Sequence, residues 1–186
     1  FPSSFPEVLG LPPKTPCLIP CAIDQDPYFR VCRDVADKLK FAKPSLIHAK
    51  FFPALQGAST KMSASDTTTS IFMDDTPKQI QKKINKYAFS GGRATLEEHR
   101  ELGGNIEVDV AYQYLSFFSY DDEKLDQLAT AYKKGELLSS EMKKECIEVL
   151  QEYVAAYQER RLKVDQTVLE SFMKPHKLTS GLIERK

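Results

Sequence analysis

The sequence lacks three features that would each indicate a class of protein. Basic and acidic residues balance at 26 each, so the chain as a whole has no basic signature for nucleic acid, and an RNA-binding surface must be a local patch. No stretch approaches the ~20 apolar residues of a membrane span, so we expect no membrane partner. No signal peptide is visible, and because the chain starts at Phe1 instead of Met, we expect the natural N-terminus to be absent.

Cysteine is also scarce, with four residues at Cys17, Cys21, Cys32 and Cys146. The first two lie in an apolar run, Cys17–Ile23, that predicts a buried strand. Four residues along a strand span roughly 13 Å, which is too far for a disulfide or for a single zinc ion. We therefore expect free core cysteines, no protein-bound metal, and a reducing, cytoplasmic location.

The first third of the chain predicts an α/β arrangement. The strand at 17–23 runs without polar alternation, which is typical of a parallel strand covered on both faces. Asp26 is a candidate N-cap before Pro27 and a helix whose apolar residues repeat at helical spacing as far as Leu39. A second strand is predicted at 45–51, which completes the βαβ order of an open parallel sheet.

The character changes to helices after Asp74 and Asp75. Capping boxes are predicted at Thr76–Gln79 and Thr95–Glu98. Helices are expected near 77–87, 95–102, 108–119, 122–134 and 139–172. We predict two domains, residues 1–75 and residues 76–186, with strands only in the first.

The first predicted domain also contains a loop, Phe52–Asp66, with neither a helical nor a strand period. Its hydroxyls, its backbone N–H groups and Lys61 could bind an anion, and the alternative is a solvated surface loop. The loop comes after the carboxyl end of the second predicted strand, and Asp24 and Gln25 come after the carboxyl end of the first. Ligands of open parallel sheets bind beyond the carboxyl ends of the strands, so both elements are predicted at the same edge.

The five residues Lys61–Ser65, KMSAS, resemble the KMSKS signature of class I aminoacyl-tRNA synthetases. Further stretches extend the resemblance to the eukaryotic and archaeal tryptophanyl-tRNA synthetase family over nearly the whole chain: Cys21–Arg30, Arg33-Asp34, Ala88–Arg93, Glu97–Arg100 and Phe172–Pro175. Tyrosyl-tRNA synthetases, which share the Asp-Gln pair and a similar loop, are the nearest alternative. The family's HIGH-type motif would lie N-terminal to this chain.

The resemblance implies the remnant of a Rossmann-like catalytic domain followed by an all-α, anticodon-binding domain. It implies a ligase that activates tryptophan with ATP, bound with Mg²⁺ as substrate, and transfers it to tRNA(Trp). It also implies a missing N-terminal half and a homodimer when intact. A non-catalytic fragment that binds tRNA or has a regulatory role is the alternative from a different class.

The resemblance places Lys61, Ser63 and Ser65 as catalytic groups on the ATP phosphates. Met62 and Ala64 would contribute mainly backbone to ATP binding. Positioned cations and donors suit this reaction because charge builds up on the phosphate oxygens. We also expect the loop to lack apolar anchors, as a mobile lid would.

Three residues near the first strand are candidates for the substrate pocket. Gln25 has both a donor and an acceptor, which suits the ammonium and carboxylate of tryptophan. Asp24 could accept from the ATP ribose or from the ammonium, or could cap the helix start. Phe29 could wall the indole pocket or pack in the core.

A tRNA contact is predicted on one later helix. Lys78, Lys82 and Lys86 fall on one helix face with Lys83 beside them, and this stripe could track phosphates or could be a solvated face. His48 is expected to be structural, and neither His99 nor His176 has the Cys/His spacing of a metal site.

Overall fold

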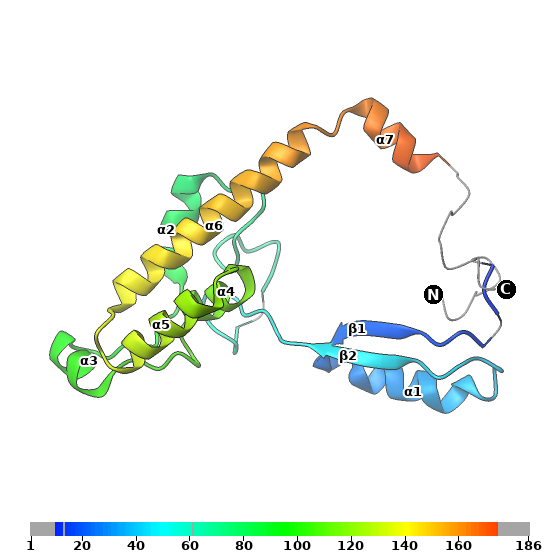
Figure 1. Cartoon of the computed structure of the whole chain (residues 1–186), viewed down its shortest axis with the longest axis horizontal. Coiled ribbons are helices and arrows are strands. Elements are labelled where there is room, and N and C mark those ends of the chain that lie inside the picture. Colours follow the sequence, from blue (N-terminus) through cyan, green and yellow to red (C-terminus); the bar gives the residue numbers. More distant parts are fainter. Residues whose placement is uncertain (1–9, 13, 61, 175–186) are drawn as a thin grey trace. The chain divides into compact units, whose positions relative to one another are not determined.

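The structure is a computed structural model that describes residues 10–12, 14–60 and 62–174. Lys61 and His176 therefore lie outside the described residues. The chain divides into two compact units, one formed by the residues up to Phe51 together with those from Phe172 on, and the other by Phe52–Ser171. Figure 1 shows the elements of both units.

The first unit has the βαβ order that the sequence predicts. Its elements are β1 (Leu18–Ala22), the 3₁₀ turn η2 (Ile23–Gln25), α1 (Asp26–Ala36) and β2 (Ser45–Ala49). The two strands pair in parallel, with Leu18 opposite Ser45 and Ala22 opposite Ala49. Their carboxyl ends therefore meet at one edge, and η2, with Asp24 and Gln25, follows directly from that edge.

The start of α1 differs from the prediction. Asp26 is the first helical residue and not the N-cap, because the 3₁₀ turn leads directly into the helix and leaves no extended residue before it. Its carboxylate instead accepts from Arg30 Nε at 2.6 Å and lies 3.2 Å from His48 Nε2. The hydrogen bond from Arg30 holds the pKa of Asp26 below its usual value. His48 thus has a structural partner, as expected.

The strands are less covered than the sequence predicts. Leu18 on β1 is 59% exposed and Ile47 on β2 is 54% exposed. Figure 1 shows α1 running along the two strands, and Arg33 on α1 donates to the carbonyl oxygen of Pro44 just before β2. One helix and two strands present too little apolar surface to cover both faces of the sheet, so the expectation of burial on both faces is wrong for the described unit.

The cysteines are free, as expected, but they are not all core residues. Cys146 is buried in the second unit, and burial raises the pKa of its thiol. Cys17 and Cys21 are half-buried and Cys32 is exposed.

The second unit is helical. Its helices are α2 (Pro77–Tyr87), α3 (Leu96–Leu102), α4 (Val110–Phe118), α5 (Asp122–Lys133) and α6 (Ser139–Leu162). A last helix, α7 (Gln166–Met173), follows α6 in the chain. No strand occurs among the described residues after Pro77, which confirms that part of the prediction. None of the described helices is long and apolar enough to cross a membrane.

The predicted single helix at 139–172 is wrong. It is interrupted between Leu162 and Gln166, where the Asp165 carboxylate accepts the backbone N–H of Val168 at 2.9 Å. An aspartate that bonds to the backbone in this way begins a new helix, because its side chain competes with the helical hydrogen-bond ladder.

The core of this unit lies where α6 packs against α2 and α4 (Figure 1). Its largest fully buried side chains include Tyr114, Tyr132, Ile80, Ile84 and Met142. The capping box at the start of α2 is confirmed, since the Thr76 and Gln79 side chains each accept from the other residue's backbone N–H. At α3, Thr95 accepts from the Glu98 N–H, which is one half of the second predicted box.

The Ser90-Gly91-Gly92-Arg93 stretch holds these helices together. The buried Asp109 carboxylate accepts from the Gly91 N–H and from the Tyr132 hydroxyl, both at 2.9 Å. A Cβ on Gly91 would lie 1.9 Å from the carbonyl oxygen of Asn105, so only glycine fits there. His99 is buried and bonds the carbonyl oxygen of Leu137 at 2.9 Å. These contacts give Gly91, His99 and Asp109 a structural role in the helical unit.

Candidate functional site

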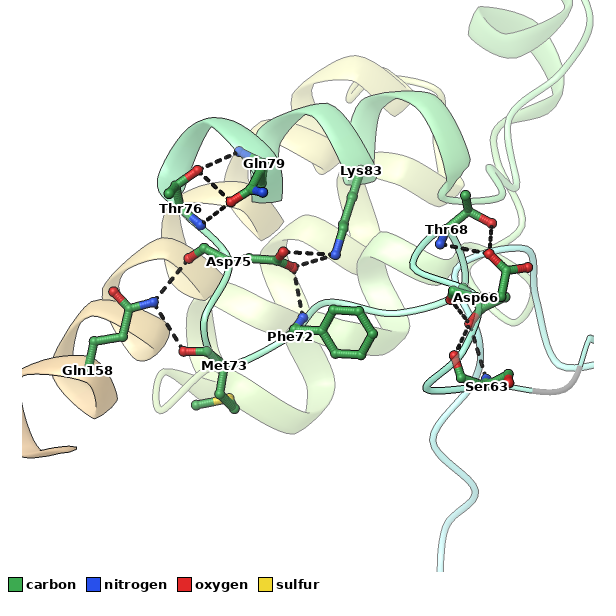
Figure 2. Close-up of polar contacts among 11 residues, drawn as sticks. Ser63, Asp66, Thr68, Phe72, Met73, Asp75, Thr76, Gln79, Lys83 and Gln158 are labelled. Carbon is green, nitrogen blue, oxygen red and sulfur yellow. Dashed lines mark hydrogen bonds and ion pairs between the residues drawn. The ribbon is translucent and has the colours of Figure 1, made fainter.

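The tip of the candidate loop is a pair of turns built on Thr69. The Ser63 N–H donates to Thr69 Oγ1 at 3.1 Å, and the Thr69 hydroxyl lies within hydrogen-bond distance of the carbonyl oxygens of Ser63 and Asp66. Thr69 is only 4% exposed, so this anchor is fixed in the second unit. Figure 2 shows the turns together with the segment that follows them.

Asp66 stabilises the second of these turns. Its Oδ1 accepts from the Thr68 N–H at 2.9 Å and from the Thr68 hydroxyl at 2.7 Å (Figure 2). These two bonds hold the pKa of Asp66 below its usual value. The negative charge is thus kept and directed into the turn.

Two of the predicted catalytic hydroxyls lie together in this loop. Ser63 Oγ and Ser65 Oγ are 2.9 Å apart. Ala64 and Ser65 are exposed, whereas Met62 and Ser63 are half-buried. Two neighbouring hydroxyls at an exposed tip can donate to the same anion, and the contribution of Lys61 stays a prediction.

The base of the loop is anchored by apolar side chains, so the expectation that it lacks them is wrong. Leu55 is fully buried, and the Phe52 ring lies 4.4 Å from the Tyr114 ring between centroids. The Leu55 N–H donates to the Thr69 carbonyl oxygen at 2.9 Å, which joins the two ends of the loop. The loop is therefore a polar tip on a packed base that belongs to the helical unit.

This packing places the boundary between the compact units before the loop, at Phe51 and Phe52. The predicted division at Asp75 and Thr76 concerns a catalytic and an anticodon-binding domain, and it stays a prediction.

The segment after the loop ends in a buried ion pair. Lys83 Nζ on α2 lies 2.9 Å from Asp75 Oδ1 and 2.6 Å from Oδ2, with side chains 12% and 6% exposed. Asp75 Oδ2 also accepts the Phe72 N–H at 2.8 Å. Lys83 is therefore occupied in the interior and does not belong to the predicted phosphate-tracking stripe.

A residue of α6 holds the same segment from the other side. Gln158 Nε2 donates to the carbonyl oxygens of Met73 and Asp75, both at 3.1 Å (Figure 2). Sequence reasoning missed Thr69, Asp75 and Gln158. The Asp-x-Thr pattern at Asp66 is a local turn signal, but nothing local links Gln158 to a carbonyl more than 80 residues away.

The other predicted pocket residues lie in the first unit. Asp24 and Gln25 are exposed, and Gln25 Nε2 donates to Asp24 Oδ2 at 3.2 Å. Asp24 does not cap a helix, since Ala22 and Gln25 occupy the N-cap positions of η2 and α1. Phe29 is half-buried on α1. A pocket shared by these residues and the loop stays a prediction.

Two features of the helical unit suit RNA. Lys78, Lys82 and Lys86 are exposed on α2, as a phosphate-tracking stripe requires. A pocket of about 330 Å³ is lined by aromatic side chains together with basic and acidic ones, among them Tyr120, Tyr153, Arg160 and Glu152. Tyr120 is 95% exposed, so its ring is accessible for stacking.

Among the described residues, no group of three or more His, Cys, Asp or Glu side chains could hold a metal ion.

Residues 14–155 match the family model described as tRNA synthetases class I (W and Y). The match covers well over half of the chain. The chain belongs to this family. Its KMSAS loop, Asp24 and Gln25 all lie within the matched range.

Named relatives are similar along the whole chain. The Saccharomyces cerevisiae protein called cytoplasmic tryptophan–tRNA ligase is 73% identical over 100% of this chain and 43% of its own length. The human protein of the same name is 55% identical over 96% of this chain and 38% of its own. A structure of tryptophanyl-tRNA synthetase from Giardia lamblia has a TM-score of 0.79 and 47% identity, covering 94% of this chain and 46% of that one. The chain thus spans less than half the length of these proteins.

Proposed function

We propose that this chain is the C-terminal part of a cytoplasmic tryptophan–tRNA ligase. The observation that carries the proposal is the 73% identity to a relative of that name across 100% of the chain, including the KMSAS loop. The ligase forms tryptophanyl-adenylate from tryptophan and ATP and transfers the aminoacyl group to tRNA(Trp).

In the activation step, a carboxylate oxygen of tryptophan attacks the α-phosphorus of ATP. The bond to the bridging oxygen breaks, and pyrophosphate leaves with that electron pair. Lys61 supplies a cation to the departing oxygens, and the Ser63 and Ser65 hydroxyls donate to them. ATP enters as its Mg²⁺ complex, which shares in neutralising the same charge.

The amino-acid pocket takes Gln25, Asp24 and Phe29 from the first unit. The Gln25 amide bonds the ammonium and carboxylate of tryptophan, Asp24 accepts from the ribose or the ammonium, and Phe29 packs on the indole. The exposed Asp24 and Gln25 at the carboxyl edge of β1 support this assignment, because such edges bind ligands in parallel sheets.

The rest of the catalytic domain covers the apolar face of the first unit. Tyr28, Val31 and Val35 repeat along one side of α1, Leu39 follows just after the helix, and each of the four is more than a third exposed. Exposed apolar patches of this kind need a partner surface. The N-terminal half of the ligase supplies it, and the intact enzyme is a homodimer.

The helical unit binds the tRNA. The lysine stripe on α2 contacts phosphates, and the pocket at Tyr120 accepts a splayed base between aromatic and basic side chains. These features also support the second candidate function, a fragment that binds tRNA without catalysing, since neither requires the catalytic half.

The test is ATP–pyrophosphate exchange by the full-length protein with tryptophan or tyrosine as the amino acid. We expect exchange that depends on tryptophan, with tyrosine slower by at least about a hundredfold, the scale of discrimination by a side-chain pocket. Exchange that prefers tyrosine would make the protein a tyrosyl relative. An absence of exchange by the full-length protein with tRNA binding intact would overturn the ligase proposal and leave tRNA binding as the function.

A further inference from the structure

The segment between the KMSAS loop and α2 is held at almost every residue. Thr69 and Ser70 are buried, and Ile71 and Met73 pack against the helical core. The Phe72 N–H is bound by Asp75, whose carboxylate is paired with Lys83. A displacement at one end of such a segment is therefore passed along it, because most of its residues are buried or hydrogen-bonded.

Both ends of this segment have identified partners. At the upstream end, Thr69 Oγ1 holds the Ser63 N–H of the loop tip. At the downstream end, Gln158 on α6 donates to the carbonyl oxygens of Met73 and Asp75. Figure 2 shows the contacts at the two ends, those of Gln158, Asp75 and Lys83 and those around Ser63, joined by the backbone of the segment.

We propose that Gln158 on α6, acting with the Asp75–Lys83 pair, is a positioning residue for the KMSAS loop in adenylate formation. It touches no reacting atom. It fixes the backbone at Met73 and Asp75, which fixes Thr69 and therefore the position of the Ser63 and Ser65 hydroxyls. This inference rests on the proposed function of the loop.

Catalysis is more sensitive to such placement than binding is. Transition-state contacts lose most of their effect when a group moves by about 1 Å, whereas tryptophan is held by residues outside the loop. The signature of a positioning role is thus a lower kcat with an unchanged KM for tryptophan.

Gln158→Met tests the proposal in the full-length protein, because it removes both donors and keeps the length of the side chain. Gln151→Met is the matched control. Gln151 lies two turns earlier on α6 and also donates to a backbone carbonyl, that of Pro77 at 2.8 Å, but its partner is the first residue of α2. A role of α6 that is only structural would affect both variants alike.

We expect Gln158→Met to lower kcat of tryptophan-dependent pyrophosphate exchange about tenfold, on the scale of displacing a catalytic group by a fraction of an ångström, with the KM for tryptophan unchanged. Gln151→Met should stay within about twofold of wild type. Thr69→Val, which keeps the shape and removes the hydroxyl, provides a second variant with the same expected signature if Gln158→Met folds poorly.

Amide hydrogen exchange tests the positioning role of Gln158 independently of the proposed ligase activity. Gln158→Met should speed exchange in residues 62–75 and leave the buried part of α6 protected, whereas Gln151→Met should not. If the wild type catalyses no exchange with tryptophan, the proposed function fails, and the hydrogen exchange still decides whether Gln158 holds the loop. Wild-type kcat in both Gln158→Met and Thr69→Val, or equal loop protection in the two glutamine variants, would overturn the proposal.

Discussion

Replacing Lys83 by methionine should severely destabilise the helical unit. The substitution removes the ammonium that lies 2.6 and 2.9 Å from the two Asp75 oxygens. Methionine matches lysine in length and in helix propensity, so α2 itself is little affected. What changes is the charge balance of a site in which both side chains are almost fully buried.

The magnitude follows from the group that is left behind. Asp75 would keep its bond from the Phe72 N–H but would lose its counterion in the interior. Removing one partner of a buried pair costs about 3–5 kcal/mol, and the lost contact of Lys83 Nζ with the Phe72 ring, at 4.4 Å from the centroid, acts in the same direction. Adding Asp75→Asn to Lys83→Met removes the stranded charge and should recover about half of that loss or more.

The assay is native-state amide hydrogen exchange of the full-length protein. Slowly exchanging amides near Cys146 and Leu150 on α6 report the free energy of opening of this unit alone. Lys82→Met is the matched control, because Lys82 is the exposed neighbour of Lys83 on the same helix, and it should change that free energy by no more than about 0.5 kcal/mol. If the two variants lost the same stability, the ion pair would not hold the segment as described.

Three further outcomes are expected. Burial raises the pKa of Tyr132 from 10.0 to about 12, so its contribution to stability is complete below pH 10 and is lost as pH rises toward 12; unfolding across this range should show a weaker pH dependence in Tyr132→Phe. The chain as printed should self-associate through the exposed face of α1, and Val31→Glu should reduce this in analytical ultracentrifugation, whereas unchanged association would locate the contact elsewhere. Replacing the three stripe lysines, Lys78, Lys82 and Lys86, with alanine should weaken tRNA binding and reduce the slope of log affinity against log salt by about 2–3. An unchanged slope would mean that the stripe is a solvated helix face.

Local chemistry made much of the fold predictable. The capping box at Thr76 depends on residues three positions apart, and the βαβ order depends on apolar runs separated by a helical pattern. The break between α6 and α7 was missed because an apolar period continues across it, while a single side chain, Asp165, starts the second helix. The burial of β1 was overestimated because an apolar strand pattern shows which faces of the strand can be buried. It does not show whether the same unit contains the elements that would cover them.

Some residues of the candidate site could likewise be predicted from the sequence, and others could not. The KMSAS motif and the Asp24-Gln25 pair each consist of consecutive residues, so both could be recognised from the sequence. The residues that hold the loop could not, since Gln158 reaches Met73 and Asp75 through tertiary structure alone. Lys83 lies beside the stripe lysines in the sequence but off their four-residue spacing, and its burial with Asp75 shows that it belongs to the interior.

The central claim, that the KMSAS loop acts on the phosphates during tryptophan activation, is tested most directly with Lys61→Ala in the full-length protein. Pyrophosphate exchange and calorimetric tryptophan binding are measured together, with Lys78→Ala as a control for a lysine outside the loop. We predict that the rate of adenylate formation falls by about a hundredfold or more, the scale for losing one preorganised electrostatic contact, while tryptophan affinity is unchanged. Lost tryptophan affinity with an unchanged rate of activation would contradict this account.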